Sequence, residues 1–241
     1  MANKSIAVSA EEAGAKSTAW ALTYADLVTL LLTFFILLLV ILNDAEKHID
    51  RVINMLLDDT YEELKESVES SYVTVERVTK GVKITMASGR LFKSMDAEVQ
   101  PMVYPLLKQI GGIIRVSKVL NVHDDPKYDK LIEAIEKRSG FLNVEIRCEG
   151  HTDDLPLPEN AQYASNWDLS TARALNIVKL LSNFSHIPES KFSAMGYGEY
   201  RPVINVNNVG KNSLNIMAAR ARNRRVEIYL DAFIKTRTLT L

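Results

Sequence analysis

The sequence predicts one membrane-spanning helix near the N-terminus, followed by a single globular domain of the α+β class. The run from Trp20 to Leu42 is apolar and reaches about 34 Å at 1.5 Å per residue, enough to cross a hydrocarbon core of about 30 Å. From about Tyr72 onward, short segments of alternating hydrophobicity are interleaved with segments of helical periodicity. The chain has 241 residues, which leaves one domain of ordinary size beyond the anchor.

Asp26 is the only Asp, Glu, Lys, Arg or His side chain within the apolar run. A charged side chain inside a membrane helix costs about 2.5–3.5 kcal/mol on insertion scales, so chains seldom carry one without a function. We therefore expect Asp26 to bind an ion or a proton beside a partner helix. The alternative is that Asp26, only about 9 Å along the axis from Trp20, reaches the membrane interface.

A narrow polar stripe accompanies Asp26 along the predicted membrane helix. Thr29 and Thr33 share its face at helical spacing, whereas leucines and phenylalanines fill much of the remaining surface. Trp20 and Tyr24 suit the level of the lipid headgroups. Threonines in membrane helices often bond only their own backbone. The functional alternative is that Tyr24, Thr29 and Thr33 tune an ion path through Asp26.

Four parts follow one another along the chain. Residues 1–17 are expected to form a polar, mobile tail, and residues 18–42 the membrane helix, which is too long for a signal-peptide core and lacks a cleavage site after it. Residues 43–71 have the periodicity of an amphipathic helix. This helix either packs on its own domain, forms a dimer stalk, or plugs an ion path. Residues 72–241 form the domain.

The domain should contain five strands and three main helices. The turn Thr79-Lys80-Gly81 predicts a hairpin between the first two strands. The expected strands are Tyr72–Val78, Val82–Met86, Asn143–Glu149, Phe192–Gly196 and Arg225–Leu230. The expected helices are Pro101–Val119, Asp125–Lys137 and Leu169–Asn183, the last capped by Ser165, Asn166 or Asp168. Residues 119–139 look like an insertion.

Composition excludes some functions and constrains others. A net charge of -1 gives no indication of nucleic-acid binding. The single cysteine, Cys148, forms no disulfide within the chain and should be a buried strand thiol. Lys4 and Lys16 before the membrane helix balance Lys47 and Arg51 after it, so the charges do not predict its orientation.

Four motifs occur in the domain in a fixed order. They are Gly150-His151-Thr152-Asp153, Asn166-x-x-Leu169-Ser170-x-x-Arg173-Ala174, Gly196-Tyr197-Gly198-Glu199-x-x-Pro202 and Asn223-Arg224-Arg225-Val226-Glu227-Ile228. Together they resemble an OmpA-like peptidoglycan-binding domain over roughly residues 83–230. The anchor, Trp20-x-x-x-Tyr24-Ala25-Asp26-x-x-Thr29 followed by Phe34-Phe35, resembles the MotB-type stator subunits of ion-driven rotary motors. The resemblance implies a mixed sheet with helices on one face.

The resemblance also implies a binding site for diaminopimelate, an amino acid of peptidoglycan stem peptides. In the family, the carboxylate at the position of Asp153 takes the ligand ammonium, and the guanidinium at the position of Arg173 takes the ligand carboxylate, which suits its planar fork. Asn166 would bond nearby backbone or ligand, and Leu169 belongs to the same motif. Arg224, with Arg225, either braces the pocket or forms a structural ion pair with Asp153 or Glu149.

The resemblance implies the partners as well. Two copies would stand inside a ring of a polytopic MotA-like partner, with their wall domains dimerised on peptidoglycan. Protons or sodium ions would load Asp26 from outside and leave inward, and no other cofactor or metal is expected; His151 lacks a second His or Cys at ligand spacing. The N-terminus would be cytoplasmic and the domain periplasmic, in the inner membrane.

The segment that joins the anchor to the domain is short, and the N-terminus is not strongly basic. Flagellar stator subunits usually have a longer tether, so the short form is more similar to the B subunit of the Zorya anti-phage system, with a ZorA-like ring partner. The flagellar stator remains the alternative.

Two further alternatives are a passive wall tether and a membrane-anchored hydrolase that uses His151 and Asp153. The hydrolase lacks a nucleophile motif such as GxSxG, so we expect no enzyme activity.

Overall fold

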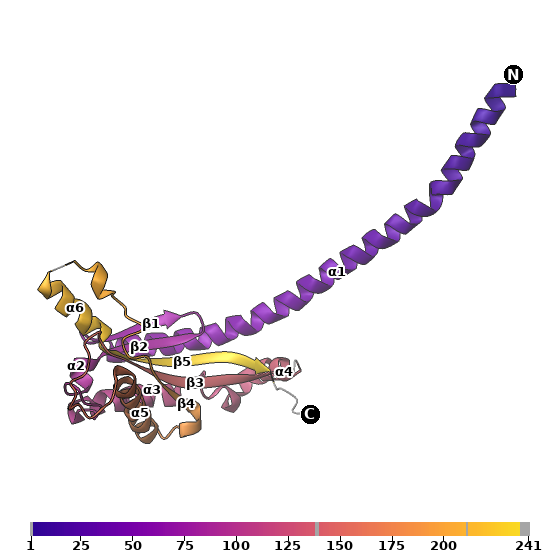
Figure 1. Cartoon of the computed structure of the whole chain (residues 1–241). Coiled ribbons are helices and arrows are strands. Elements are labelled where there is room, and N and C mark those ends of the chain that lie inside the picture. Colours follow the sequence, from indigo (N-terminus) through magenta and orange to yellow (C-terminus); the bar gives the residue numbers. More distant parts are fainter. Residues whose placement is uncertain (1, 138–139, 211, 237–241) are drawn as a thin grey trace. The chain divides into compact units, whose positions relative to one another are not determined.

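The computed structural model describes residues 2–137, 140–210 and 212–236, and describes the backbone alone for residues 2–19 and 43–48. The chain separates into two compact units, Met1–Asp50 and Arg51–Leu241, which are considered in turn. The second unit holds a five-stranded sheet and its helices (Figure 1). An N-terminal apolar helix followed by an α+β domain with a mixed sheet confirms the predicted fold class.

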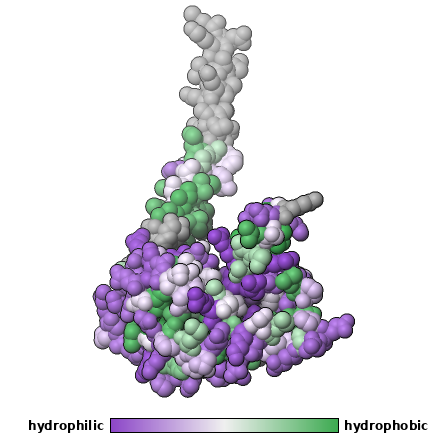
Figure 2. All heavy atoms as spheres, turned by 90° about the vertical axis from the view of Figure 1, so that its left-hand side faces the viewer, coloured by the Kyte–Doolittle hydropathy of each residue, from purple (hydrophilic) through white to green (hydrophobic). Residues whose placement is uncertain are grey.

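The first helix, α1 (Ala2–Val68), is continuous through three of the predicted parts. Its segment Trp20–Leu42 is long and apolar enough to cross a membrane, and none of it is buried within the chain. Figure 2 shows the mostly hydrophobic surface of this segment between two grey stretches. The helix already begins at Ala2, so the predicted tail before residue 18 has a helical backbone. Alanine, glutamate and lysine are frequent there and favour helix, and proline is absent.

The strands form one mixed sheet in the order β1-β2-β5-β3-β4 (Figure 1). Their bounds are β1 (Val73–Val78), β2 (Gly81–Ala87), β3 (Gly140–His151), β4 (Phe192–Gly196) and β5 (Arg225–Thr236). The predicted hairpin is confirmed, since Val78 pairs with Gly81. Strand β3 lies antiparallel to β5 and parallel to β4, and α5 (Asn166–Ser185) connects β3 to β4. This connection places the ends of β3 and β4 next to the start of α5.

The helices cover one face of the sheet, which carries the apolar half of each alternating strand. Helix α5 contacts β3, β4 and α3 (Tyr104–Val116), and α4 (Asp129–Glu136) contacts β3. The inward side chains include Ile84, Ile146, Cys148, Ile177 and Ile228, all almost fully buried. The buried strand thiol of Cys148 is therefore confirmed, and burial raises its pKa to about 12.

The last part of α1 agrees with one predicted alternative, and three further segments show features that were not predicted. The last part of α1, from Arg51 to Val68, buries Leu56, Leu57 and Leu64 within the second unit, as the packed alternative predicted. Within residues 119–137, Val119, Val122, Tyr128, Leu131 and Ile135 are core residues, so the stretch predicted as an insertion packs into the domain. The sequence analysis also missed α2 (Ser88–Leu91) and α6 (Ser213–Asn223). Helix α6 exposes apolar residues such as Leu214 and Met217, so it lacks a clear amphipathic pattern.

Candidate functional site

A cavity of about 540 Å³ opens where β3 ends and α5 begins. All five residues predicted for ligand binding in the domain line it, namely Asp153, Asn166, Leu169, Arg173 and Arg224. The segment Phe92–Met95 and the loop Leu155–Pro158 complete its wall. The sequence analysis did not identify these two walls, since neither carries a motif and each reaches the cavity only through the fold.

Two glycines let α5 approach the sheet closely enough to form this cavity. A Cβ on Gly150 of β3 would lie 2.1 Å from the carbonyl oxygen of Ser170 on α5. A Cβ on Gly196 of β4 would lie 2.2 Å from the hydroxyl oxygen of Thr171. Both distances are far below van der Waals contact, so only glycine fits. The motifs that contain these glycines therefore fix the position of the helix that carries Asn166, Leu169 and Arg173.

Asp153 and Arg224 form an ion pair at the cavity. Arg224 Nη1 donates to Asp153 Oδ2 at 2.5 Å, and the backbone N–H of Leu155 donates to Asp153 Oδ1 at 3.3 Å. The Asp153 side chain is only 10% exposed, whereas that of Arg224 is 41% exposed. Arg224 therefore forms the ion pair with Asp153 that was one of its two predicted roles, and it also lines the cavity.

Arg173 is buried and is held by backbone carbonyl groups rather than by a carboxylate. Its Nε donates to the carbonyl oxygen of Asp96 at 2.8 Å, and its Nη2 approaches that of Lys93 at 3.5 Å. The guanidinium also lies over the ring of Phe92, 5.0 Å from the centroid. Burial lowers the pKa of Arg173 to about 10, so the side chain remains charged at neutral pH. Of its five N–H donors, these contacts use two.

Asn166 begins α5 and connects the cavity to the loop after β4. Its side-chain amide donates to the carbonyl oxygen of Leu155 at 3.0 Å and to Glu199 Oε2 at 2.9 Å. Ser165, one of the three predicted caps, accepts from the backbone N–H of Asp168. Leu169, one turn further along, is buried and forms an apolar part of the cavity wall.

Two neighbouring charged side chains form ion pairs of their own. Asp154 is half exposed, and Arg220 of α6 donates to both of its carboxylate oxygens at 2.7 and 2.9 Å. This pairing lowers the pKa of Asp154. Arg225 pairs with neither Asp153 nor Glu149; its Nε donates to Glu227 at 2.7 Å on the same strand. Residues two apart on a strand lie on the same face of the sheet, so Glu227 is the natural partner of Arg225.

A second cluster of charges lies buried on the sheet face opposite the core helices. His151 is 1% exposed, and its Nε2 lies 3.7 Å from Glu149 and 3.8 Å from Glu227. These distances exceed hydrogen bonds, and within the described residues neither ring nitrogen has a bonded partner. Burial, together with Arg225, lowers the pKa of His151 to about 4, so the ring is neutral. Arg147 and Arg225 balance the two glutamates. His151 therefore packs, stacked on Tyr197.

The ion-site residues predicted on the membrane segment lie exposed along α1 of the isolated chain. The hydroxyl of Thr29 donates to the backbone carbonyl of Asp26 at 2.8 Å, and that of Thr33 donates to the carbonyl of Leu30 at 2.9 Å. Both threonines thus form hydrogen bonds to their own helix backbone, which is one of the two alternatives predicted for them. Each oxygen keeps its acceptor lone pairs. The Tyr24 ring lies tilted against that of Trp20, with ring centroids 6.4 Å apart.

Two protein families match separate parts of the chain. Residues 4–58 match the family described as membrane MotB of the proton-channel complex MotA/MotB. Residues 116–216 match the OmpA family. The first match covers the apolar segment with Asp26, and the second covers Asp153, Asn166, Leu169 and Arg173 of the cavity.

Individual relatives agree with these matches. Motility protein B of Bacillus subtilis is 28% identical over 69% of this chain, and the match spans about half (51%) of that relative's length. The uncharacterized protein YtxE of Bacillus subtilis is 24% identical over 89% of this chain and 88% of its own. The fold is similar to a crystal structure of a MotB-like protein from Desulfovibrio vulgaris, with a TM-score of 0.55, 23% identity, and coverage of 76% of this chain and 99% of that one. The chain is therefore similar to MotB in residues 4–58 and to the OmpA family in residues 116–216.

Proposed function

We propose that the chain is the peptidoglycan-anchored B subunit of an ion-driven rotary motor. The observation that carries this proposal is the combination, in one chain, of an apolar helix with a single acidic side chain and a domain whose cavity gathers the five residues of the wall-binding pattern. Asp26 alternates between neutral and charged forms as protons, or sodium ions, pass. A MotA-like ring partner steps around two copies of the chain, which peptidoglycan holds still.

The energy scale supports this role for Asp26. One elementary charge that crosses a membrane potential of 100 mV releases about 2.3 kcal/mol. This is close to the cost of about 2.5–3.5 kcal/mol for a charged side chain in a membrane helix. A change in the charge of Asp26 can therefore change which face of a partner ring the helix prefers.

The cavity has the chemistry for the zwitterionic end of diaminopimelate. A carboxylate from Asp153 and the guanidinium groups of Arg173 and Arg224 line the same space. The ligand ammonium would compete with Arg224 for Asp153, while the freed Arg224 and the unused donors of Arg173 would bind the ligand carboxylate. In this proposal the domain lies in the periplasm and the N-terminus lies in the cytoplasm.

Cosedimentation of the full chain, in detergent, with purified sacculi tests the wall-binding part. Asp153→Ala and Arg173→Ala should each abolish sedimentation. Asp154→Ala and Arg220→Ala are matched controls, because this neighbouring acid–arginine pair does not line the cavity. Circular dichroism shows whether each variant is folded. Folded Asp153 and Arg173 variants that still sediment would contradict the proposal.

We further propose antiviral defence of the Zorya type as the process that the motor powers. The short connection supports it, because α1 ends at Val68 and β1 begins at Val73, which leaves no long tether. The similarity to motility protein B supports the flagellar alternative. Deletion of the gene separates the two: loss of phage resistance with normal swimming supports defence, and loss of swimming supports the flagellar motor.

A further inference from the structure

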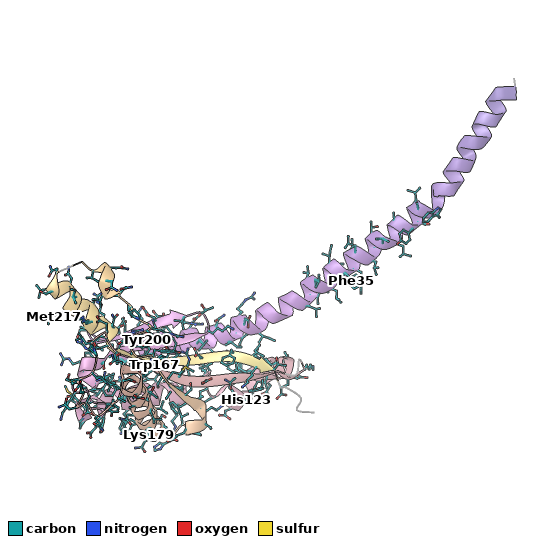
Figure 3. The ribbon with its side chains drawn as sticks, viewed as in Figure 1. Phe35, His123, Trp167, Lys179, Tyr200 and Met217 are labelled. Carbon is teal, nitrogen blue, oxygen red and sulfur yellow. The ribbon has the colours of Figure 1, made fainter. Side chains whose placement is uncertain are left out.

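Two exposed aromatic side chains lie next to the cavity, on the side of the loop that follows β4. Trp167, in the first turn of α5, is 46% exposed, and Tyr200 is 65% exposed. Their ring centroids are 5.4 Å apart, with an angle of 32° between the planes. Figure 3 labels both residues side by side. In the described part of the domain the only other aromatic side chain of comparable exposure is Tyr72, at 38%.

Residues next to the aromatic pair in the sequence form a hydrogen bond at the cavity wall. Asn166, which lines the cavity, precedes Trp167, and its amide donates to Glu199, which precedes Tyr200. The backbone N–H of Tyr200 also donates to the carbonyl oxygen of Tyr197, which closes a turn. One hydrogen bond therefore links the cavity wall to the loop that holds Tyr200.

Polar residues flank the aromatic pair in the sequence. Glu199 is half-buried, and Asp168 and Arg201 are exposed on the residues that follow Trp167 and Tyr200. An aromatic face with hydrogen-bonding groups at its edge suits a pyranose ring, which presents C–H groups on one face and hydroxyls around its rim. A large, exposed aromatic pair of this kind typically marks a binding site.

We propose that Trp167 and Tyr200 bind a sugar ring of the peptidoglycan glycan strand. The inference rests on the proposed function, since it assigns the second half of the same ligand. In peptidoglycan the stem peptide is attached to an N-acetylated sugar, and diaminopimelate is its third residue. Three residues of an ordinary peptide span about 10 Å, and the γ-linked glutamate of the stem lengthens this only slightly. A stem peptide in the cavity therefore brings its sugar within reach of a neighbouring surface, and the aromatic pair is the surface equipped to take it.

Titration of the full chain, in detergent, with two synthetic ligands tests the proposal. The ligands are the stem tripeptide alone and the same tripeptide attached to its disaccharide. The disaccharide should tighten binding about fivefold to tenfold. Trp167→Ala and Tyr200→Ala should each reduce this gain without changing the affinity for the tripeptide, and Trp167→Phe should retain part of it. Met217→Ala, an equally exposed apolar residue on α6, serves as control.

A second measurement separates this proposal from the function on which it rests. The chain has two tryptophans, so Trp20→Phe leaves Trp167 as the sole tryptophan, which excitation at about 295 nm selects over the tyrosines. Glycan strands without peptides should then shift the tryptophan emission. The shift should be the same in the Trp20→Phe protein and in the protein that carries both Trp20→Phe and Asp153→Ala. Equal affinity for the two synthetic ligands, or an emission unchanged by glycan strands, would overturn the sugar site. Failure of the tripeptide to bind, with a retained response to glycan strands, would instead overturn the diaminopimelate site alone.

Discussion

Arg224 at the start of the last strand holds Asp153, whose carboxylate lies 71 positions earlier in the sequence, at 2.5 Å across the edge of the cavity. The acid proposed to bind a ligand ammonium is thus already neutralised by a cation of the chain itself. Burying a carboxylate without a partner is costly, so this pair keeps the empty cavity stable. Ligand binding then becomes an exchange of one cation for another.

The first prediction concerns this pair. In a double-mutant cycle, Asp153→Asn and Arg224→Gln should show a coupling of about 1 kcal/mol in the free energy of unfolding, a value limited by the partial exposure of Arg224. Chemical denaturation of the four proteins measures it. Strictly additive single effects would show that the contact contributes no stability.

The second prediction concerns Gly150, where α5 meets β3. Gly150→Ala should lower the free energy of unfolding by about 1–3 kcal/mol or more, because the new methyl group would meet the backbone of Ser170. Gly112→Ala is the matched control: this exposed position in α3 has no atom near a new Cβ. There alanine should raise stability by about 0.5–1 kcal/mol through helix propensity. A neutral Gly150→Ala would refute the close approach of helix and strand.

The third prediction concerns pH and His151. Its pKa in the folded chain is about 4, below the ordinary value of 6.5, so the unfolded chain takes up the proton first as the pH falls. The free energy of unfolding should therefore decrease as the pH falls from about 6.5 to about 4, by at most about 3 kcal/mol in full. Denaturation at about pH 7 and about pH 5 measures the slope. His151→Gln, which cannot titrate, should flatten it; an unchanged slope would exclude His151 as the cause.

Local patterns predicted much of the fold because they depend on neighbours in sequence. The span Trp20–Leu42 and strand β4 agree with their predicted bounds, and the hairpin turn lies at Thr79-Lys80-Gly81. The membrane span, the strand and the turn follow from periodicity and turn chemistry. The resemblance to OmpA-like domains, carried by the motifs, predicted which side chains gather at one cavity.

Contacts between distant segments could not be predicted in the same way. The pairing of Asp154 with Arg220 joins residues 66 positions apart, and the carbonyl groups that hold Arg173 lie 77 and 80 positions before it. Every residue type has the same backbone carbonyl group, so no sequence motif indicates which carbonyl groups bind Arg173. Helix α6 was missed because its exposed apolar residues do not form one stripe.

We propose above that Asp26 carries the ion that drives the motor. The most direct test purifies the membrane complex through a tag on the full chain, reconstitutes it in liposomes, and follows ion uptake under an imposed potential with proton- and sodium-sensitive dyes. Asp26→Asn should abolish uptake while the complex keeps its composition, and Asp26→Glu should retain part of it. Uptake by the Asp26→Asn complex at the rate of the unmodified protein would contradict the account.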